Sequence, residues 1–319
     1  MKIAVLGAGS LGCAIGGVLT EAGHSLWLIN RNTALVELLN TRGLILRDNG
    51  VDRKVMVRAA SNAADVGQVD LVIVLVKSFD TVQAMTGAMS LLGPDTTVLS
   101  LQNGAGHEDM LADIVGRERV LAGKTYAGGT QLGLGHITIG TAGRDTYIGE
   151  LDGGMTQRVQ AIAQLFTAAG LTTTVSENIL GTIWDKLLVN VATGALSGIT
   201  GLSYGDLYSV PEVEACAIAA VAEAMAVARA SGVRLSTAEP RQTWTRAAEG
   251  LPFEFKASML QSIEKGSVTE VDFVNGAVVR QGIKVGVPTP INQTLLACLK
   301  GIERRVVQPP TIDALDQHA

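Results

Sequence analysis

Three glycines near the start of the chain stand at a fixed spacing, Gly7-x-Gly9-x-x-Gly12, between an apolar run and a helical pattern. In such a loop the first glycine makes a tight turn, the second lets the backbone approach a pyrophosphate, and the third lets the helix pack on the strand. The N–H groups at the helix N-terminus then attract the anion. A plain glycine-rich turn is the alternative. We predict a dinucleotide-binding loop formed by Gly7, Ala8, Gly9, Ser10, Leu11 and Gly12.

A basic residue follows the second apolar run, where a carboxylate would bind the ribose 2′-hydroxyl of NAD. The run continues as Asn30-Arg31-Asn32, and the next acid is Glu37. A guanidinium forms bidentate, charge-assisted hydrogen bonds with phosphate. Arg31 therefore predicts NADP as the cofactor. The alternative is that Arg31 is only a solvated surface residue, which would leave the choice between NADP and NAD open.

Two further polar residues follow apolar runs, and ligands of open α/β sheets bind at these strand ends. Lys77 could reach a cofactor phosphate or ribose, and Asn103 could orient the nicotinamide or the substrate. A solvent-exposed lysine and a simple Asn-Gly turn are the alternatives.

Lys186 and Asn190 stand one helical turn apart, so they share one face of a very apolar helix. Taken alone, the lysine could simply extend its ammonium to solvent. Beside a nicotinamide, the ammonium could stabilise the alkoxide that forms when a hydride adds to a carbonyl, and supply its proton. Asn190 would bind the same substrate.

A carboxylate later in the chain, Glu270, has two interpretations. Ser267-x-x-Glu270 has the pattern of a capping box at the start of a helix. Alternatively, the carboxylate pairs with Lys186 or contacts the cofactor.

The pattern of apolar residues predicts an α/β fold in two domains. The first, residues 1–176, is a Rossmann-type, doubly wound, mostly parallel sheet with strands at Lys2–Leu6, Ser25–Ile29, Leu71–Val76 and Thr97–Leu101. It also includes a small strand pair at Gly135–Gly140 and Thr146–Gly149, a helix at Thr156–Ala169 and a strand at Thr172–Val175. The second, residues 177–319, is all-helical, with helices at Asn178–Ser197, Glu212–Ser231, Thr237–Ala248, Phe253–Lys265, Glu270–Arg280 and Thr289–Arg304. A loose tail follows from Gln308.

The composition narrows the function classes. The 319 residues carry a net charge of −5 without a basic patch, so we expect no nucleic-acid partner. The cysteines Cys13, Cys216 and Cys298 have neither metal-ligand nor disulfide spacing, and the histidines form no metal site or triad. We expect no signal peptide and no membrane span, and therefore a cytoplasmic protein, with a homodimer as a plausible assembly.

Together these residues resemble the ketopantoate reductase family. The glycine loop, Arg31, Lys77, Gln-Asn103-Gly, Lys186-x-x-x-Asn190, Ser258 and Thr-Glu270-Val-Asp occur in the family's order. The resemblance implies that Lys186 is the general acid and that Asn190 and Ser258 contact the substrate. It also implies that Glu270 supports the catalytic and cofactor region, and that Lys77, Asn103 and Ala127 line the NADPH site.

The sequence departs from the family at two positions. Gly194 and Tyr204 stand where an ungapped alignment expects two more substrate-contacting asparagines. A polar site that lacks a partner can discriminate strongly between substrates.

We therefore expect an NADPH-dependent reduction of a 2-oxo acid to a 2-hydroxy acid, with ketopantoate as the best named substrate. Three alternatives stay open. They are a related 2-hydroxy-acid dehydrogenase with another substrate, a β-hydroxyacid dehydrogenase, which shares the Lys-x-x-x-Asn helix, and a non-catalytic NADP-binding sensor.

Overall fold

The structure is a computed structural model that describes residues 1–307, so the tail predicted from Gln308 onward lies outside the described residues. The chain forms two compact units, Met1–Thr182 and the part from Ile183 onward. The division falls within helix α6 (Ile179–Thr200). The functional domain boundary expected at residue 176 stays a prediction.

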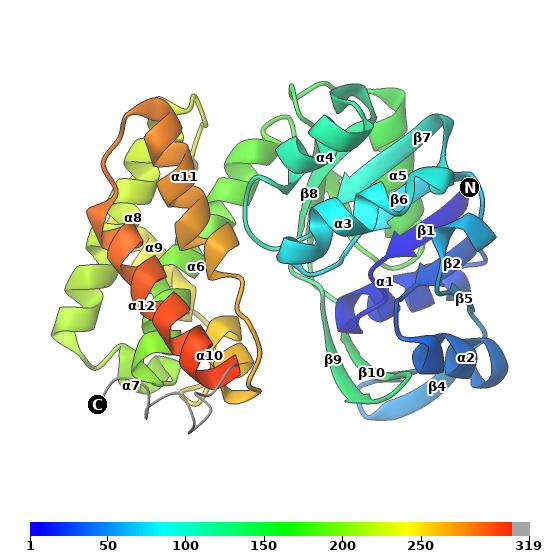
Figure 1. Cartoon of the computed structure of the whole chain (residues 1–319), viewed down its shortest axis with the longest axis horizontal. Helices are drawn as coiled ribbons and strands as arrows, with labels where there is room; N and C mark the ends of the chain where they lie inside the picture. The colour runs from blue at the N-terminus through cyan, green and yellow to red at the C-terminus, as the bar shows by residue number, and fades with distance from the viewer. Residues whose placement is uncertain (308–319) are drawn as a thin grey trace, which may run out of the picture. The chain divides into compact units, whose positions relative to one another are not determined.

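The first unit is built on an eight-stranded sheet in the order β12-β11-β8-β7-β6-β1-β2-β5. All neighbouring strands are parallel except the antiparallel pair β8 and β11, as Figure 1 shows in part. The mostly parallel sheet of the sequence prediction is therefore confirmed. The strands are β1 (Lys2–Leu6), β2 (Ser25–Ile29), β5 (Arg58–Ala60), β6 (Val69–Val74), β7 (Leu92–Ser100), β8 (Val120–Thr125), β11 (Thr146–Glu150) and β12 (Thr173–Val175).

Helices cover both faces of this sheet because its strands are apolar on both sides. In β1, Ile3 and Val5 pack into a core with α1, α2 and α5, whereas Ala4 and Leu6 pack into a second core with α3 and α4. The helices are α1 (Ser10–Glu21), α2 (Thr33–Arg42), α3 (Thr81–Thr86), α4 (His107–Val115) and α5 (Gln157–Ala168). Short 3₁₀ turns are η1 (Ala63–Asp65), η2 (Ser78–Asp80), η3 (Met89–Leu91) and η4 (Arg117–Arg119).

A second, four-stranded sheet in the order β4-β3-β10-β9 packs against α1. It corrects one prediction, because the two strands expected to pair with each other belong to different sheets. β10 (His136–Gly140) pairs with β9 (Gly128–Gly133) and β3 (Leu44–Asp48), whereas β11 pairs with β8 in the large sheet. The edge strand β4 (Val51–Val55) pairs with β3.

The second unit is helical throughout the part that the structure describes, which confirms the predicted class. Its helices are α6, α7 (Tyr204–Leu207), α8 (Pro211–Ala230), α9 (Pro240–Ala248), α10 (Ser258–Glu264), α11 (Asn275–Val285) and α12 (Pro290–Val307), with a 3₁₀ turn η5 (Val271–Phe273). The helix predicted from Phe253 begins only at Ser258, and the helix predicted from Glu270 is divided between η5 and α11.

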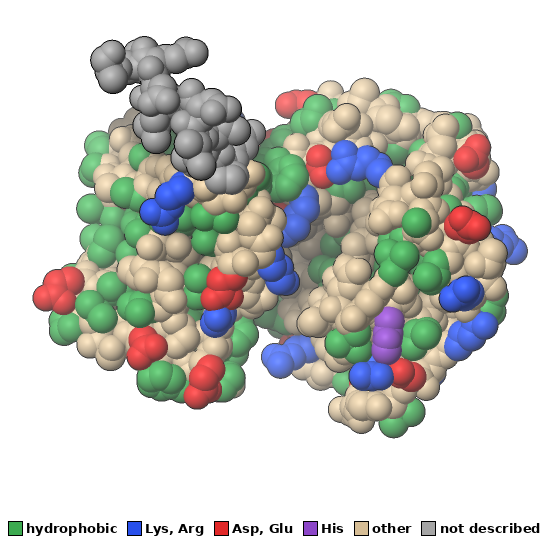
Figure 2. All heavy atoms as spheres, turned by 60° about the horizontal axis from the view of Figure 1, so that its bottom comes forward, with side chains coloured by type: hydrophobic (Ala, Val, Ile, Leu, Met, Phe, Trp, Pro, Cys, Tyr) green, Lys and Arg blue, Asp and Glu red, His purple; other side chains and the backbone are tan. Residues whose placement is uncertain are grey.

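Helix α6 is long and apolar enough to cross a membrane by length and composition alone. However, 67% of its most apolar stretch is buried inside the structure, as in the core helix of a folded domain. On the face shown in Figure 2, acidic and basic side chains are interspersed with apolar ones on both units.

Candidate active site

The glycine loop between β1 and α1 has the geometry that its spacing predicts. Gly7 has a φ of +105°, and a Cβ there would lie 2.4 Å from the backbone N of Val76. A Cβ at Gly12 would lie 2.2 Å from the carbonyl oxygen of Gly7. By contrast, nothing lies within 4 Å of a Cβ at Gly9, the N-cap of α1. Packing therefore requires a glycine at positions 7 and 12, and the open space beside Gly9 suits an anion at the helix N-terminus.

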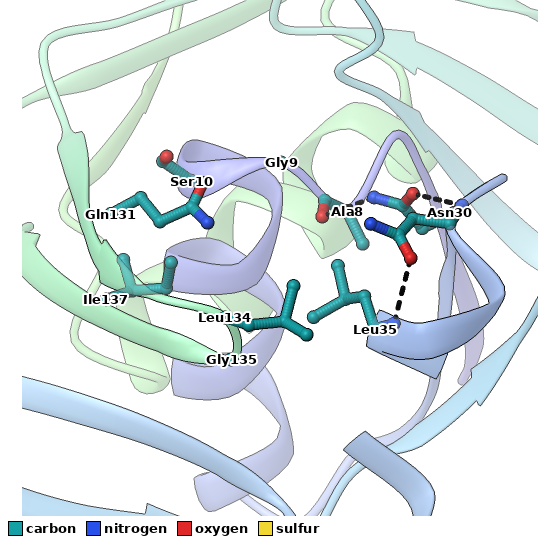
Figure 3. Close-up of a pocket in the computed structure, with 10 residues that line it drawn as sticks. Ala8, Gly9, Ser10, Asn30, Leu35, Gln131, Leu134, Gly135 and Ile137 are labelled. Atoms are coloured by element: carbon teal, nitrogen blue, oxygen red, sulfur yellow. Dashed lines mark hydrogen bonds between the residues drawn. The ribbon is translucent and has the colours of Figure 1, made fainter. Parts of the chain in front are cut away.

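The end of β2 holds this loop in place. The carbonyl oxygen of Ile29 accepts hydrogen bonds from the N–H groups of Gly7 (3.1 Å) and Ala8 (3.0 Å). The Asn30 side chain donates to the Ala8 carbonyl oxygen (2.8 Å) and accepts from the N–H of Asn32 (2.9 Å) (Figure 3). Sequence reasoning missed Asn30, although a polar side chain directly after a buried strand was a usable signal.

Arg31 lies at the carboxyl end of the second strand, as predicted, with 77% of its side chain exposed. Its guanidinium contacts the carboxylate of Asp80, with Nη2 and Oδ2 2.9 Å apart. Asp80 lies in η2, which follows β6. The cation expected to bind a 2′-phosphate thus contacts an acid from the segment after β6, a strand that β1 separates from β2 in the sheet.

Lys77 and Asn103 are both exposed, and the structure brings their loops together at the ends of β6 and β7. Gln102, which is 9% exposed, donates from Nε2 to the Val76 carbonyl oxygen at 2.9 Å. The Ser78 hydroxyl donates to the Asn103 carbonyl oxygen at 3.3 Å. Gln102 is a second positioning residue that sequence reasoning missed, because its partners lie more than twenty residues away.

A pocket of about 160 Å³ lies beside the glycine loop, between α2 and the β9–β10 hairpin (Figure 3). Its lining residues are Ala8, Gly9, Ser10, Asn30, Asn32, Leu35, Gln131, Leu134, Gly135 and Ile137. The hairpin approaches α1 so closely that a Cβ at Gly129 would lie 2.5 Å from the Ser10 carbonyl oxygen. Ala127, which precedes β9, is buried and donates its N–H to the Thr125 hydroxyl at 3.0 Å.

Helix α6 carries Lys186 and Asn190, both half-buried, one turn apart. Gly194 continues the same face by another turn, and a Cβ there would lie 3.2 Å from Cε of Met259. Met259 directly follows Ser258, the first residue of α10, so this contact places the start of α10 next to Gly194, and Ser258 itself is exposed. All four positions belong to the second unit.

Tyr204, the second departure from the family pattern, is buried in an aromatic cluster. Its hydroxyl shares a hydrogen bond with that of Thr193 at 2.9 Å, and its ring meets Phe255 edge-on at 5.0 Å. Burial raises the pKa of the Tyr204 phenol. The family pattern expects asparagine amides at positions 194 and 204. Here the Met259 thioether lies next to Gly194, and Tyr204 contributes an aromatic ring.

The structure excludes the capping-box interpretation of Glu270. Ser267 donates to the Ser262 carbonyl oxygen (3.0 Å), at the end of α10, instead of capping a following helix. Thr269 is fixed by Glu303, whose carboxylate accepts from its N–H at 2.7 Å. Glu270 is half-buried and directly precedes η5. Of the two interpretations of Glu270, the one that stays a prediction is a carboxylate that pairs with Lys186 or contacts the cofactor.

Among residues 1–307, no three His, Cys, Asp or Glu side chains are grouped so that they could hold a metal ion. Cys13 is buried within α1, where burial raises the pKa of its thiol to about 12. This thiol therefore belongs to the core and stays protonated.

The fold and the loops define a class of protein with a Rossmann-type unit, a glycine-rich loop at the end of its first strand, and a helical second unit. Residues 3–153 match the family described as "Ketopantoate reductase PanE/ApbA", and residues 178–303 match its C-terminal part. The chain belongs to the ketopantoate reductase family.

Relatives match along nearly the whole chain. The chain is 32% identical to a 2-dehydropantoate 2-reductase of Pyrococcus horikoshii, over 95% of this chain and 98% of that protein. A protein of the same name from Halobacterium salinarum is also 32% identical, over 95% of this chain and 99% of that protein.

Solved structures agree in fold. A PanE/ApbA family ketopantoate reductase from Ralstonia eutropha has a TM-score of 0.87 and 36% identity, covering 96% of this chain and 99% of that one. A D-mandelate dehydrogenase, solved with NADH and anilino(oxo)acetate, has a TM-score of 0.88 and 27% identity, with the same coverage.

Proposed function

We propose that this protein reduces a 2-oxo acid to a 2-hydroxy acid with NADPH. The observation that carries the proposal is the pair Lys186 and Asn190, half-buried one turn apart on α6, in a chain whose first unit has a glycine loop with open space at the N-terminus of α1. Membership of the ketopantoate reductase family supports the same reaction.

The nicotinamide cofactor would be held by the loops at the strand ends of the first unit. The open space before Gly9 and the N-terminus of α1 suit its pyrophosphate. Arg31 would bind the 2′-phosphate, exchanging or sharing its contact with Asp80. Lys77, Asn103 and Ala127 would line the rest of the cofactor site. When bound, this cofactor supplies a hydride to the carbonyl carbon of the substrate.

The chain's own residues would supply binding and the proton. The Lys186 ammonium stabilises the negative charge that develops on the carbonyl oxygen and donates a proton from Nζ. Asn190 hydrogen-bonds the substrate, and the Ser258 hydroxyl binds its carboxylate. Glu270 supports the lysine and the cofactor region with its negative charge, and Asn103 orients the reacting groups.

2-Dehydropantoate (ketopantoate) is the first substrate to test, because the relatives along nearly the whole chain carry the name 2-dehydropantoate 2-reductase. A second candidate is a 2-oxo acid with an apolar side chain, such as phenylglyoxylate. The Met259 thioether at Gly194 and the buried ring of Tyr204 favour it, as does the likeness to D-mandelate dehydrogenase.

The test follows NADPH absorbance with a panel of 2-oxo acids, including ketopantoate and phenylglyoxylate, and the reverse reaction with 2-hydroxy and 3-hydroxy acids. We expect turnover with at least one 2-oxo acid and a preference for NADPH over NADH. Activity with 3-hydroxy acids alone would instead support a β-hydroxyacid dehydrogenase. Tight NADPH binding without turnover would support a sensor.

A further inference from the structure

Asn30 directly follows β2 and precedes Arg31, at the strand end where dinucleotide sites for NAD carry a ribose-binding carboxylate. Its backbone is fixed by the sheet, since its N–H donates to the carbonyl oxygen of Ala60 (3.1 Å) beside β2. The side chain is half-buried and faces the glycine loop (Figure 3).

The Asn30 amide holds two backbone segments at once. Nδ2 donates to the Ala8 carbonyl oxygen at 2.8 Å, and Oδ1 accepts from the Asn32 N–H at 2.9 Å. The orientation of the amide is unambiguous, because a carbonyl oxygen can only accept and a backbone N–H can only donate. Asn32 in turn caps α2 through the N–H of Leu35 at 3.1 Å. One side chain therefore connects the glycine loop to the start of α2.

This contact complements the one from the preceding residue. The Ile29 carbonyl oxygen accepts from the N–H groups of Gly7 and Ala8, and Asn30 donates to the carbonyl oxygen of Ala8. Residues 29 and 30 thus bind both the N–H groups and a carbonyl oxygen of the loop, immediately before the exposed Gly9. Both polar atoms of the amide are engaged by the backbone.

We infer that Asn30 is a positioning residue that fixes the phosphate-binding loop, and that its amide cannot be replaced by the carboxylate that NAD-type sites use there. The inference rests on the proposed function for its cofactor. An aspartate has no donor, so one of its oxygens would face the Ala8 carbonyl oxygen at the present 2.8 Å. Recognition of the 2′ position is then left to Arg31.

The test compares Asn30→Asp with a matched control, Asn40→Asp. Asn40 makes the same kind of amide bracket elsewhere in the unit, donating to the Ala59 carbonyl oxygen (2.9 Å) and accepting from the Ala59 N–H (2.8 Å). Three quantities are measured on the full chain: the melting temperature, hydrogen exchange of the peptide spanning residues 7–12, and the Kd values of NADPH and NADH.

We expect both variants to lose melting temperature. Only Asn30→Asp should exchange faster in the loop and bind NADPH about 10-fold or more weakly, the usual effect of losing a buried hydrogen bond and adding a repulsive contact. Its affinity for NADH should not rise. If Asn30→Asp does not fold, Asn30→Ser replaces it, since the single, shorter-reaching hydroxyl of serine cannot bond both the Ala8 carbonyl oxygen and the Asn32 N–H as the two polar atoms of the amide do.

Unchanged exchange in the loop, or tighter NADH binding by Asn30→Asp, would overturn the inference. Failure of the proposed function is a separate result, because it would show in the unmodified protein, which would then either not bind NADPH or bind it without reducing any 2-oxo acid. The exchange measurement needs no cofactor and decides the role of Asn30 in either case.

Discussion

At the scale of single residues, the proposed chemistry depends on the ammonium of Lys186. Replacing it with alanine removes the proton donor and the positive charge beside the developing oxyanion. We predict that Lys186→Ala lowers kcat by about 100-fold or more. Lys284→Ala is the control, because Lys284 is an exposed lysine in the last turn of α11. Equal kcat values in both variants, with unchanged melting temperatures, would remove Lys186 from the mechanism.

Arg31 and Asp80 form a contact that the cofactor 2′-phosphate would compete with or share. Arg31→Ala should lower kcat/KM for NADPH by about 10-fold or more and leave that for NADH nearly unchanged. Asp80→Asn should raise the NADPH preference, because it removes a competing carboxylate while keeping a side chain of the same size. The measurement is the ratio of kcat/KM values with the two cofactors at low salt. A lower NADPH preference in Asp80→Asn would contradict this interpretation.

Glu108 gives a prediction for pH dependence. Its carboxylate accepts from the Gly106 N–H at 3.2 Å, and burial raises its pKa above the ordinary 4.5. Because the folded-state pKa is the higher one, its protonated form stabilises the fold at low pH, and this contribution is lost as pH rises through the raised value. The melting temperature of Glu108→Gln, relative to that of the unmodified protein, should therefore increase as the pH rises above the ordinary glutamate pKa of 4.5. A difference that does not vary with pH would refute this.

The sequence predicted Arg31, Lys77, Lys186 and Asn190 because each follows or lies within a strong apolar pattern. It could not predict Asp80, which meets Arg31 from 49 residues away. It also could not reveal that the Ser267 hydroxyl bonds backward, to a carbonyl oxygen near the end of α10. The four-residue pattern of a capping box can occur in a sequence whether or not a helix starts there.

At the scale of elements, the predicted helices and strands agree with the observed ones where the local sequence alone determines the structure of a segment. Strands β1 and β2 lie where predicted because both are short, apolar runs with clear ends. The β3–β4 hairpin was missed although Asn49-Gly50, with φ values of +49° and +81°, is a common two-residue hairpin turn. Residues 253–255 are not helical because their backbone is used elsewhere, as the carbonyl oxygens of Phe253 and Phe255 accept from Gly205 and Tyr204.

A buried polar network connects three helices of the second unit. Asn292 in α12 is fully buried and donates from Nδ2 to the carboxylate of Glu223 in α8 (2.8 Å) and to the Ala220 carbonyl oxygen (2.9 Å). Asn275 of α11 donates to Asn292 Oδ1 at 3.0 Å. Removing one member leaves its partners buried without a hydrogen bond, which costs about 1–3 kcal/mol for each group.

We therefore predict that Asn292→Ala lowers the free energy of unfolding by about 2–4 kcal/mol. Urea unfolding of the full chain measures this change. Thr294→Ala is the control, because Thr294 is at an exposed position on the same helix and its hydroxyl donates to the Pro290 carbonyl oxygen within that helix. Equal stability losses in the two variants would show that the network contributes nothing specific.

At the scale of the whole molecule, the class of fold was predictable because two kinds of periodicity divide the chain. Runs of consecutive apolar residues indicated a parallel sheet covered on both faces, and long helical patterns followed. The second sheet was not predictable, because β10 pairs with β3, about 90 residues earlier, and a strand's partner is not encoded in its local pattern.

The proposed function uses both units, since the glycine loop and Arg31 belong to the first and Lys186, Asn190 and Ser258 to the second. The central claim is that a hydride passes from NADPH to the carbonyl carbon of a 2-oxo acid. The most direct test uses NADPH that is deuterated at the transferred position of the nicotinamide, with ketopantoate and phenylglyoxylate as substrates. We predict that mass spectrometry finds one deuterium on C2 of the 2-hydroxy acid product. A product without deuterium at C2, or no product from either substrate, would contradict the account.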